Sequence, residues 1–203
     1  MKSKVEEFTE YLISANIIEE EDKEVYIYGI KNAFILFSHI VLYVVIAVVS
    51  GMFKESVFFI VTYFALRMYA GGYHARTQSL CNFFSTTVFI MALLAIRYSP
   101  NSVLLCCLIV VVSSIIVFLL SPVEDQNKPL IELEKVMYRK KTYIVLAIQI
   151  IISLVLLIKW NKYLTEIKSI AMGLLLMAVV LILGTVKNYS RGSVQREIED
   201  TNI

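Results

Sequence analysis

The sequence from Tyr98 to Leu120, YSPNSVLLCCLIVVVSSIIVFLL, contains no Asp, Glu, Lys or Arg. A hydrocarbon layer about 30 Å thick takes about 20 apolar residues of α-helix to cross. A helix also satisfies its own backbone polar groups, which lipid requires of any spanning segment. The stretch therefore predicts a transmembrane helix. The whole chain agrees, because 58% of its 203 residues are hydrophobic and only 18% are charged.

Five further stretches are long enough, or nearly so, to cross the same layer. They are residues 32–53, 56–75, 77–96, 142–158 and 169–186. Two of them are weaker, because Arg67 and Gly71-Gly72 interrupt one and Gln78-Ser79 makes the start of another polar. We therefore predict an all-α, polytopic helical membrane protein with about six transmembrane segments. Four spans with interfacial or re-entrant segments are the alternative.

Basic residues predict the orientation, because cytoplasmic loops retain Lys and Arg. Six spans place both termini, the His74–Cys81 region and the loop 122–141 on one side. The opposite side would hold only five of the 19 Lys and Arg residues, Lys54, Arg97, Lys159, Lys162 and Lys168. We therefore predict that the first side is cytoplasmic. The formal net charge is only +2, and nothing indicates nucleic-acid binding.

The first 30 residues are acidic and lack the features of a cleavable secretory signal, so the first span is expected to act as an uncleaved anchor. Apolar residues alternate there with polar ones, and residues 1–30 could form an amphipathic helix on the inner membrane face. A solvated hinge is the simpler interpretation of the acidic run Glu19–Asp22. Residues 1–203 are interpreted as one integral membrane domain.

His74 and Cys81 are the candidates for chemistry. A thiolate must form before a cysteine attacks a carbonyl, and an imidazole is a common base for it. In a continuous helix, the seven residues between them would separate the pair by about 10 Å along the axis. Proton transfer needs about 3 Å. A bend after Gly71-Gly72 could close that gap, whereas residue types alone fit an incidental His and Cys equally well.

The other histidine and cysteines favour packing roles. Cys106-Cys107 lies in the apolar stretch quoted above, where low polarity suppresses thiolate formation. His39 lies inside the first span, where helix packing is favoured over a proton relay. One His near one Cys is too few ligands for a zinc site. We therefore predict no metal and no cofactor.

Two segments carry a resemblance to a known family. Arg67, Gly71-Gly72-Tyr73-His74-Ala75 and Cys81, on a multi-span chain, resemble the signature of the accessory gene regulator B (AgrB) family of quorum-sensing membrane endopeptidases. The segment Ser121-Pro122-Val123-Glu124-Asp125-Gln126-Asn127-Lys128-Pro129-Leu130, followed by Arg139-Lys140-Lys141, resembles that family's central cytoplasmic loop. Length, span layout and both segments agree.

The resemblance implies a reaction on an AgrD-like propeptide with an amphipathic leader, a central signal segment and an acidic tail. Cys81 would attack the carbonyl that ends the signal segment and hold the peptide as a thioester, while His74 acts as base and then as acid. An internal thiol or hydroxyl would close a cyclic thiolactone or lactone. A homodimer would fit the family, and membrane lipid would surround the protein.

Supporting roles are predicted for several further residues. Arg67, with Gly71 and Gly72, would support the site by orienting a carboxylate or stabilising the thiolate, although its guanidinium could instead pair with a lipid headgroup. Arg139, Lys140 and Lys141 could capture the acidic tail, or could be an ordinary topology signal. Lys128 belongs to the resemblance without a derived role. The candidates for a third partner of His74 are Glu124, Asp125, Gln78 and Asn82.

The competing class is a non-enzymatic peptide transporter or export partner. Such a protein typically shows internal repeats and paired broken helices in its two halves. The first three predicted spans do not recur in the last three, and a second Gly-Gly-Tyr-His element is absent from the sequence. The sequence therefore favours the peptidase.

Overall fold

The computed structural model describes residues 4–73, 78–124 and 130–201, with the side chains of residues 78, 79 and 191–201 left out. Within these ranges the chain forms α-helices and one short 3-10 helix, without a β-strand. The predicted all-α fold is confirmed. The chain divides into two compact units, Met1–Ser50 and Gly51–Ile203.

The first unit contains α1 (Lys4–Ser14), the 3-10 turn η1 (Glu20–Asp22) and α2 (Lys23–Val49). Part of the predicted amphipathic segment is thus helical. Lys23 Nζ lies 3.4 Å from Glu10 Oε1, which joins the start of α2 to α1. The acidic run forms the turn between these helices.

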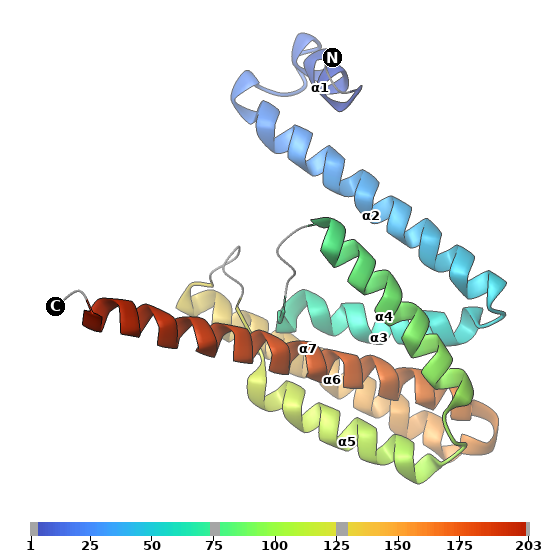
Figure 1. Ribbon diagram of the computed structural model, residues 1–203. Coiled ribbons are helices and arrows are strands. Elements are labelled where there is room, and N and C mark those ends of the chain that lie inside the picture. The colour runs from blue at the N-terminus through green and yellow to red at the C-terminus, as the bar shows by residue number, and fades with distance from the viewer. Residues whose placement is uncertain (1–3, 74–77, 125–129, 202–203) are drawn as a thin grey trace. The chain divides into compact units, whose positions relative to one another are not determined.

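The second unit contains five helices, shown in Figure 1: α3 (Phe53–Ala70), α4 (Gln78–Tyr98), α5 (Val103–Leu120), α6 (Glu132–Ile158) and α7 (Trp160–Thr201). The starts of α3 and α7 are joined by the ion pair of Lys54 and Glu166. The start of α7 also meets the start of α5, because Lys168 Nζ donates to Asn101 Oδ1 at 2.8 Å. Their far ends also meet, so α3, α5 and α7 run parallel.

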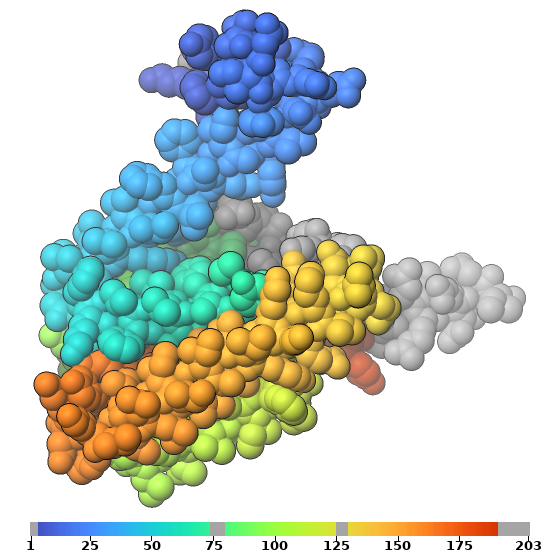
Figure 2. Space-filling model, turned by 180° about the vertical axis from the view of Figure 1, so that it is seen from behind, coloured from blue at the N-terminus to red at the C-terminus, as the bar shows by residue number. Residues whose placement is uncertain are grey.

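Helix α7 is the centre of this unit. Leu174, Met177 and Leu181, at helical spacing on α7, are fully buried together with Leu66 of α3 and Val117 of α5. Burial of such side chains contributes about 1.5 to 3 kcal/mol each in water, whereas close packing must supply the association within lipid. Figure 2 shows α6 lying between α3 and α5 on one face of the unit.

Among the residues that the structure describes, five helical segments are long and apolar enough to cross a membrane: Glu20–Val49, Leu80–Tyr98, Val103–Leu120, Glu132–Ile158 and Trp160–Ser190. They correspond to five of the six predicted stretches. Helix α3 corresponds to the sixth, and it carries Lys54, Glu55 and Arg67 within its 18 residues. Because α3 nevertheless lies along α7 from the Lys54–Glu166 pair to its last turn, the arrangement favours six spans over four.

The predicted loop 122–141 is partly helical, because α6 begins at Glu132 rather than near residue 142. Glu132 and Glu134 occupy the first turn, where negative charge stabilises a helix. Glu134 Oε2 also accepts from the backbone N–H of Ile131 at 3.2 Å. The basic cluster 139–141 therefore lies on a helix, which corrects its predicted place in a loop.

Candidate functional site

The Gly71-Gly72 pair ends α3 as predicted. The helix stops at Ala70, and the two glycines have φ angles of 70° and 111°. These values favour glycine because a side chain would be strained there. The next helix begins at Gln78, so Arg67 and Cys81 lie on different helices. The predicted break in the helix is confirmed.

The turn at Gly71-Gly72 pairs with Val123 through main-chain atoms. The N–H of Val123 donates to the carbonyl of Ala70 at 2.9 Å, and the N–H of Gly72 donates to the carbonyl of Val123 at 3.1 Å. A Cβ atom on Gly71 would lie 2.1 Å from the Val123 carbonyl oxygen. The two segments that carry the family resemblance are therefore in direct contact.

Helix α7 completes this arrangement. The N–H of Tyr73 donates to the carbonyl of Val180 at 3.1 Å. Asn188 Nδ2 donates to the carbonyl of Glu124 at 2.9 Å, and Lys187 Nζ lies 4.9 Å from the centre of the Tyr73 ring. We call the three segments 71–73, 121–124 and 180–188 the junction. It gathers the ends of α3, α5 and the membrane-spanning part of α7.

Arg67 holds the turn of the junction from the side of α3. Its guanidinium donates to the carbonyls of Gly71 and Tyr73. Basic side chains near a helix end can satisfy the last carbonyls in this way. This role was missed from the sequence, although the four-residue spacing of Arg67 and Gly71 is the signal that could have shown it.

His74 and Ala75 lie outside the described residues, so the predicted closeness of His74 to Cys81 stays a prediction. Tyr73, directly before His74, is held by the junction, and Cys81 is half-buried on the first turn of α4.

The side chain of Glu124, one of the candidates for a third partner of His74, makes polar contacts with the start of α6 and the segment before it. Its Oε1 lies 2.8 Å from Lys135 Nζ, and its Oε2 accepts from the backbone N–H of Leu130 at 3.5 Å. These contacts tie the junction to the start of α6 and compete with any role beside His74. Asp125 and Lys128, and the side chain of Gln78, lie outside the described part of the chain.

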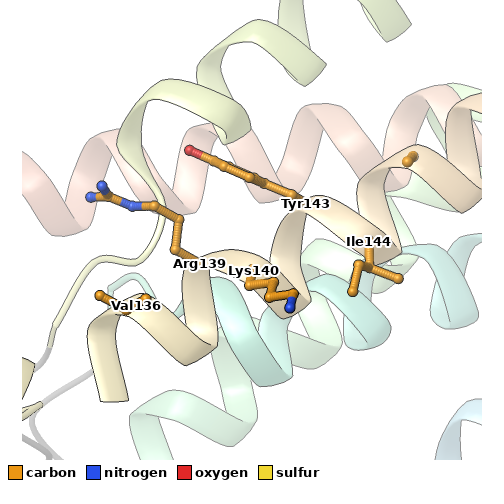
Figure 3. A pocket seen from close by; sticks show the side chains of 6 residues that line it. Val136, Arg139, Lys140, Tyr143 and Ile144 are labelled. Carbon is orange, nitrogen blue, oxygen red and sulfur yellow. The ribbon is translucent and has the colours of Figure 1, made fainter. Parts of the chain in front are cut away.

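The basic cluster is divided between two sides of α6. Arg139 and Lys140 line a surface groove of about 500 Å³, together with Val136, Tyr143, Ile144 and Ala147 (Figure 3). Arg139 Nε also donates to the carbonyl of Ser121 at 3.3 Å, which joins the groove to the junction. The Nζ atom of Lys141 instead lies 5.4 Å from the centre of the Tyr69 ring on α3.

The remaining cysteines and His39 lie within helices of the apolar stretches. Cys106 is buried and Cys107 half-buried on α5, as expected for adjacent helical residues that face different directions. The ring of His39 lies 5.8 Å from the ring of Tyr43 on α2. Among the residues that the structure describes, three or more His, Cys, Asp or Glu side chains do not gather into a metal-binding group.

These features define a multi-pass helical membrane protein in which the segments after α3 and α5 meet α7 at one end of a helical bundle. The chain belongs to the AgrB family, accessory gene regulator B, whose match covers residues 5–182.

The chain is also similar to a "Putative AgrB-like protein" of Listeria innocua serovar 6a, with 27% identity over 125 residues. That match covers 60% of this chain and 60% of the relative, so less than two thirds of the relative is represented. No solved structure matches the chain.

Proposed function

We propose that this protein is a membrane cysteine endopeptidase that removes the C-terminal tail of an AgrD-like propeptide and cyclises the remainder. The junction is the observation that carries this proposal. It joins the two segments of the family resemblance and holds the backbone of Tyr73, the residue directly before His74. Cys81 follows on the first turn of α4.

The reaction requires two acyl transfers. His74 takes the proton of Cys81, and the thiolate attacks the carbonyl carbon that ends the signal segment. The C–N bond breaks, His74 donates its proton to the leaving amine of the tail, and the peptide remains as a thioester on Cys81. A thiol or hydroxyl within the peptide then attacks the thioester, forms the ring and releases Cys81 as a thiol.

A site at the end of an apolar bundle favours ring closure over hydrolysis. A tethered nucleophile has a high effective concentration, and a water-poor site slows the competing attack by water. The half-buried position of Cys81 fits this requirement. The amphipathic leader of the substrate would lie on the same cytoplasmic leaflet as residues 1–30. A leaderless peptide that is processed equally fast would contradict this part of the proposal.

The acidic tail is assigned to the basic residues of α6. Arg139 and Lys140 would bind carboxylates of the tail in the groove. Such contacts between exposed charges weaken as salt shortens the Debye length from about 10 Å at 0.1 M to about 3 Å at 1 M. The Michaelis constant is therefore expected to rise with salt for a substrate with its tail.

The proposed placement is the bacterial cell membrane, with both termini and the junction on the cytoplasmic side. The loop after α3, the loop after α5 and the end of the membrane-spanning part of α7 lie together, as an even number of preceding spans requires. The basic residues near these loops support the cytoplasmic assignment. A homodimer is proposed from the family resemblance alone.

The test is intact mass analysis of a matched propeptide incubated in vesicles with the wild-type protein, Cys81→Ala and His74→Ala. With the wild type we expect loss of the tail and a product one water lighter than the linear cleaved peptide. Both variants should leave the propeptide intact. An unchanged propeptide with the wild type, or the same product from all three proteins, would refute the peptidase and favour a transporter or export partner.

A further inference from the structure

We propose that Gly184 is a positioning residue for the reaction, because the absence of a side chain at this position lets the turn before His74 pack directly against α7. This inference rests on the proposed function. Gly184 lies beyond residues 5–182, which the family match covers. It also lies on a helix that contains neither His74 nor Cys81. The proposal therefore adds the end of α7 to the parts of the chain that shape the site.

The space around Gly184 is too small for a side chain. A Cβ atom there would lie 2.8 Å from the backbone N of Tyr73 and 3.0 Å from the backbone C of Gly72. It would also lie 3.0 Å from Cγ1 of Val123. Two of these three neighbours are main-chain atoms, which cannot rotate away as a flexible side chain can. A methyl group at position 184 must therefore displace the turn.

The position of Gly184 on the helix explains the contact. A helical carbonyl accepts a hydrogen bond from the residue four positions later and keeps a second lone pair. Helical side chains tilt toward the N-terminus, so the side chain at 184 would cover the carbonyl of Val180. Because Gly184 leaves this carbonyl open, the N–H of Tyr73 can donate to it at 3.1 Å.

The partner surface is equally tight. A Cβ atom on Gly72 would lie 2.8 Å from Cγ1 of Val180 and 2.6 Å from a guanidinium nitrogen of Arg67. The turn is thus enclosed between α7 and Arg67, with a glycine on each side of the contact. A displacement at Gly184 consequently moves the Tyr73 backbone, from which the chain continues to His74.

A second glycine of α7 shows why this effect is local. Gly173 lies about three helical turns before Gly184, and therefore on nearly the same face. A Cβ atom on Gly173 would lie 2.8 Å from Cγ2 of Thr62, in the middle of the α3–α7 packing. Gly184 instead meets the turn beyond the end of α3. A substitution at Gly184 should therefore disturb the site more than the packed core.

The experiment compares Gly184→Ala with Gly29→Ala in membrane vesicles. Gly29 lies on α2 with no atom within 4 Å of an added Cβ, so both changes raise helix propensity but only one meets an obstacle. For Gly184→Ala we expect kcat for tail release to fall about tenfold or more with a nearly unchanged KM, equivalent to about 1.4 kcal/mol per tenfold. Gly29→Ala should stay within about twofold of the wild type.

A second readout separates positioning from stability. Alkylation of Cys81, measured by peptide mass spectrometry across pH, reports how readily its thiolate forms and thus whether a base lies beside it. The profile of Gly184→Ala should move toward higher pH, in the direction of His74→Ala, without a lower unfolding temperature. A profile and kcat equal to those of the wild type would overturn the proposal, and so would parallel loss of activity and thermal stability.

The same proteins distinguish this proposal from the proposed function. If the wild type processes the propeptide and Cys81→Ala does not, the peptidase stands whatever Gly184→Ala does. If the wild type leaves the propeptide intact, the peptidase and the positioning role fail together. If His74→Ala and the wild type share one alkylation profile, the base role of His74 and the positioning role of Gly184 fail, and cleavage by Cys81 is still judged by Cys81→Ala. Normal processing by Gly184→Ala beside an inactive Cys81→Ala would remove only the positioning role.

Discussion

The two ends of the parallel helices α3, α5 and α7 are joined by different kinds of interaction. At the junction, three main-chain hydrogen bonds join the segments, among them the one from Gly72 to Val123 at 3.1 Å. At the opposite end they are made by charged side chains. Glu166 pairs with Lys54, and Lys168 donates to the carbonyl of Ser99 at 2.8 Å.

This difference determines what each end tolerates. A main-chain contact leaves no room for added atoms, so a single methyl group can break it. A side-chain contact accepts changes of shape but depends on charge, because a buried group that loses its partner bears the full cost of desolvation. Substitutions at the junction should therefore affect catalysis, whereas substitutions at the opposite end should affect stability.

The largest effect is expected for Gly71→Ala, because the new Cβ would lie 2.1 Å from the Val123 carbonyl oxygen. The rate of tail release should fall about 100-fold or more, equivalent to about 2.7 kcal/mol. Gly51→Ala is the matched control, since Gly51 has nearly the same φ angle, 68° against 70°, and no atom within 4 Å of an added Cβ. Equal losses in both variants would show that backbone strain, not the junction, causes the effect.

Lys168→Met tests the opposite end. Lys168 is only 5% exposed, and loss of its amino group leaves the Ser99 carbonyl and the Asn101 side chain without this donor. We expect a loss of stability of about 2 to 3 kcal/mol, visible as a lower unfolding temperature in detergent. The tail-release rate per folded molecule should stay near that of the wild type. A selective loss of activity would contradict the division between the two ends.

Arg67→Lys should have a smaller effect on catalysis. Lysine keeps the positive charge but lacks the planar fork with which Arg67 reaches the carbonyls of Gly71 and Tyr73. The rate of tail release is expected to fall about tenfold, or about 1.4 kcal/mol. Arg97→Lys serves as the control, because Arg97 lies in the last turn of α4, at the end of that helix opposite to Cys81. A fully active Arg67→Lys protein would mean that charge alone is needed.

The smallest expected change is in the pH dependence of the contribution of Lys54, which precedes the predicted span 56–75. Its hydrogen bond to Glu166 raises the pKa of Lys54 above its usual value, against the opposing effect of burial. A raised pKa stabilises the fold fully below the unfolded value of about 10.4, and this contribution is lost as the pH rises through the folded pKa. The difference in unfolding temperature between the wild type and Lys54→Met should therefore stay constant from about pH 6 to pH 9. A difference that changed within this window would rule out the pair as its source.

Hydropathy and glycine positions predicted much of the fold. The uncharged stretch 98–120 contains α5, and Gly71-Gly72 marks the end of α3. Both signals are local, because a span depends on its own residues and a positive φ angle on its own glycine. The start of α6 was placed too late, since hydropathy excludes a charged first turn that Glu132 and Glu134 in fact stabilise.

The contacts of the junction could not be predicted in this way. Gly72 and Val123 pair through main-chain atoms, which every residue possesses, so residue identity at these positions does not predict the pairing. The contact of Gly184 could not be predicted either, because a glycine within an apolar helix indicates only a position of low helix propensity. Arg67 offered two interpretations, since a guanidinium can hold a substrate or a backbone turn. Only the three-dimensional arrangement shows its carbonyl partners.

Helix α7 takes part both in the main-chain contacts of the junction and in the charged side-chain contacts at the opposite end. The length of α7 between these contacts therefore sets the distance between the two ends of the bundle. From Glu166 to Gly184 it measures about 27 Å at 1.5 Å per residue, close to the thickness of a bilayer's hydrocarbon core. Because α3 and α5 contact α7 both at the junction and at the opposite end, we expect that these helices do not slide past one another to match a thinner bilayer. They must tilt as a block, and the cysteine end of the bundle would tilt with them.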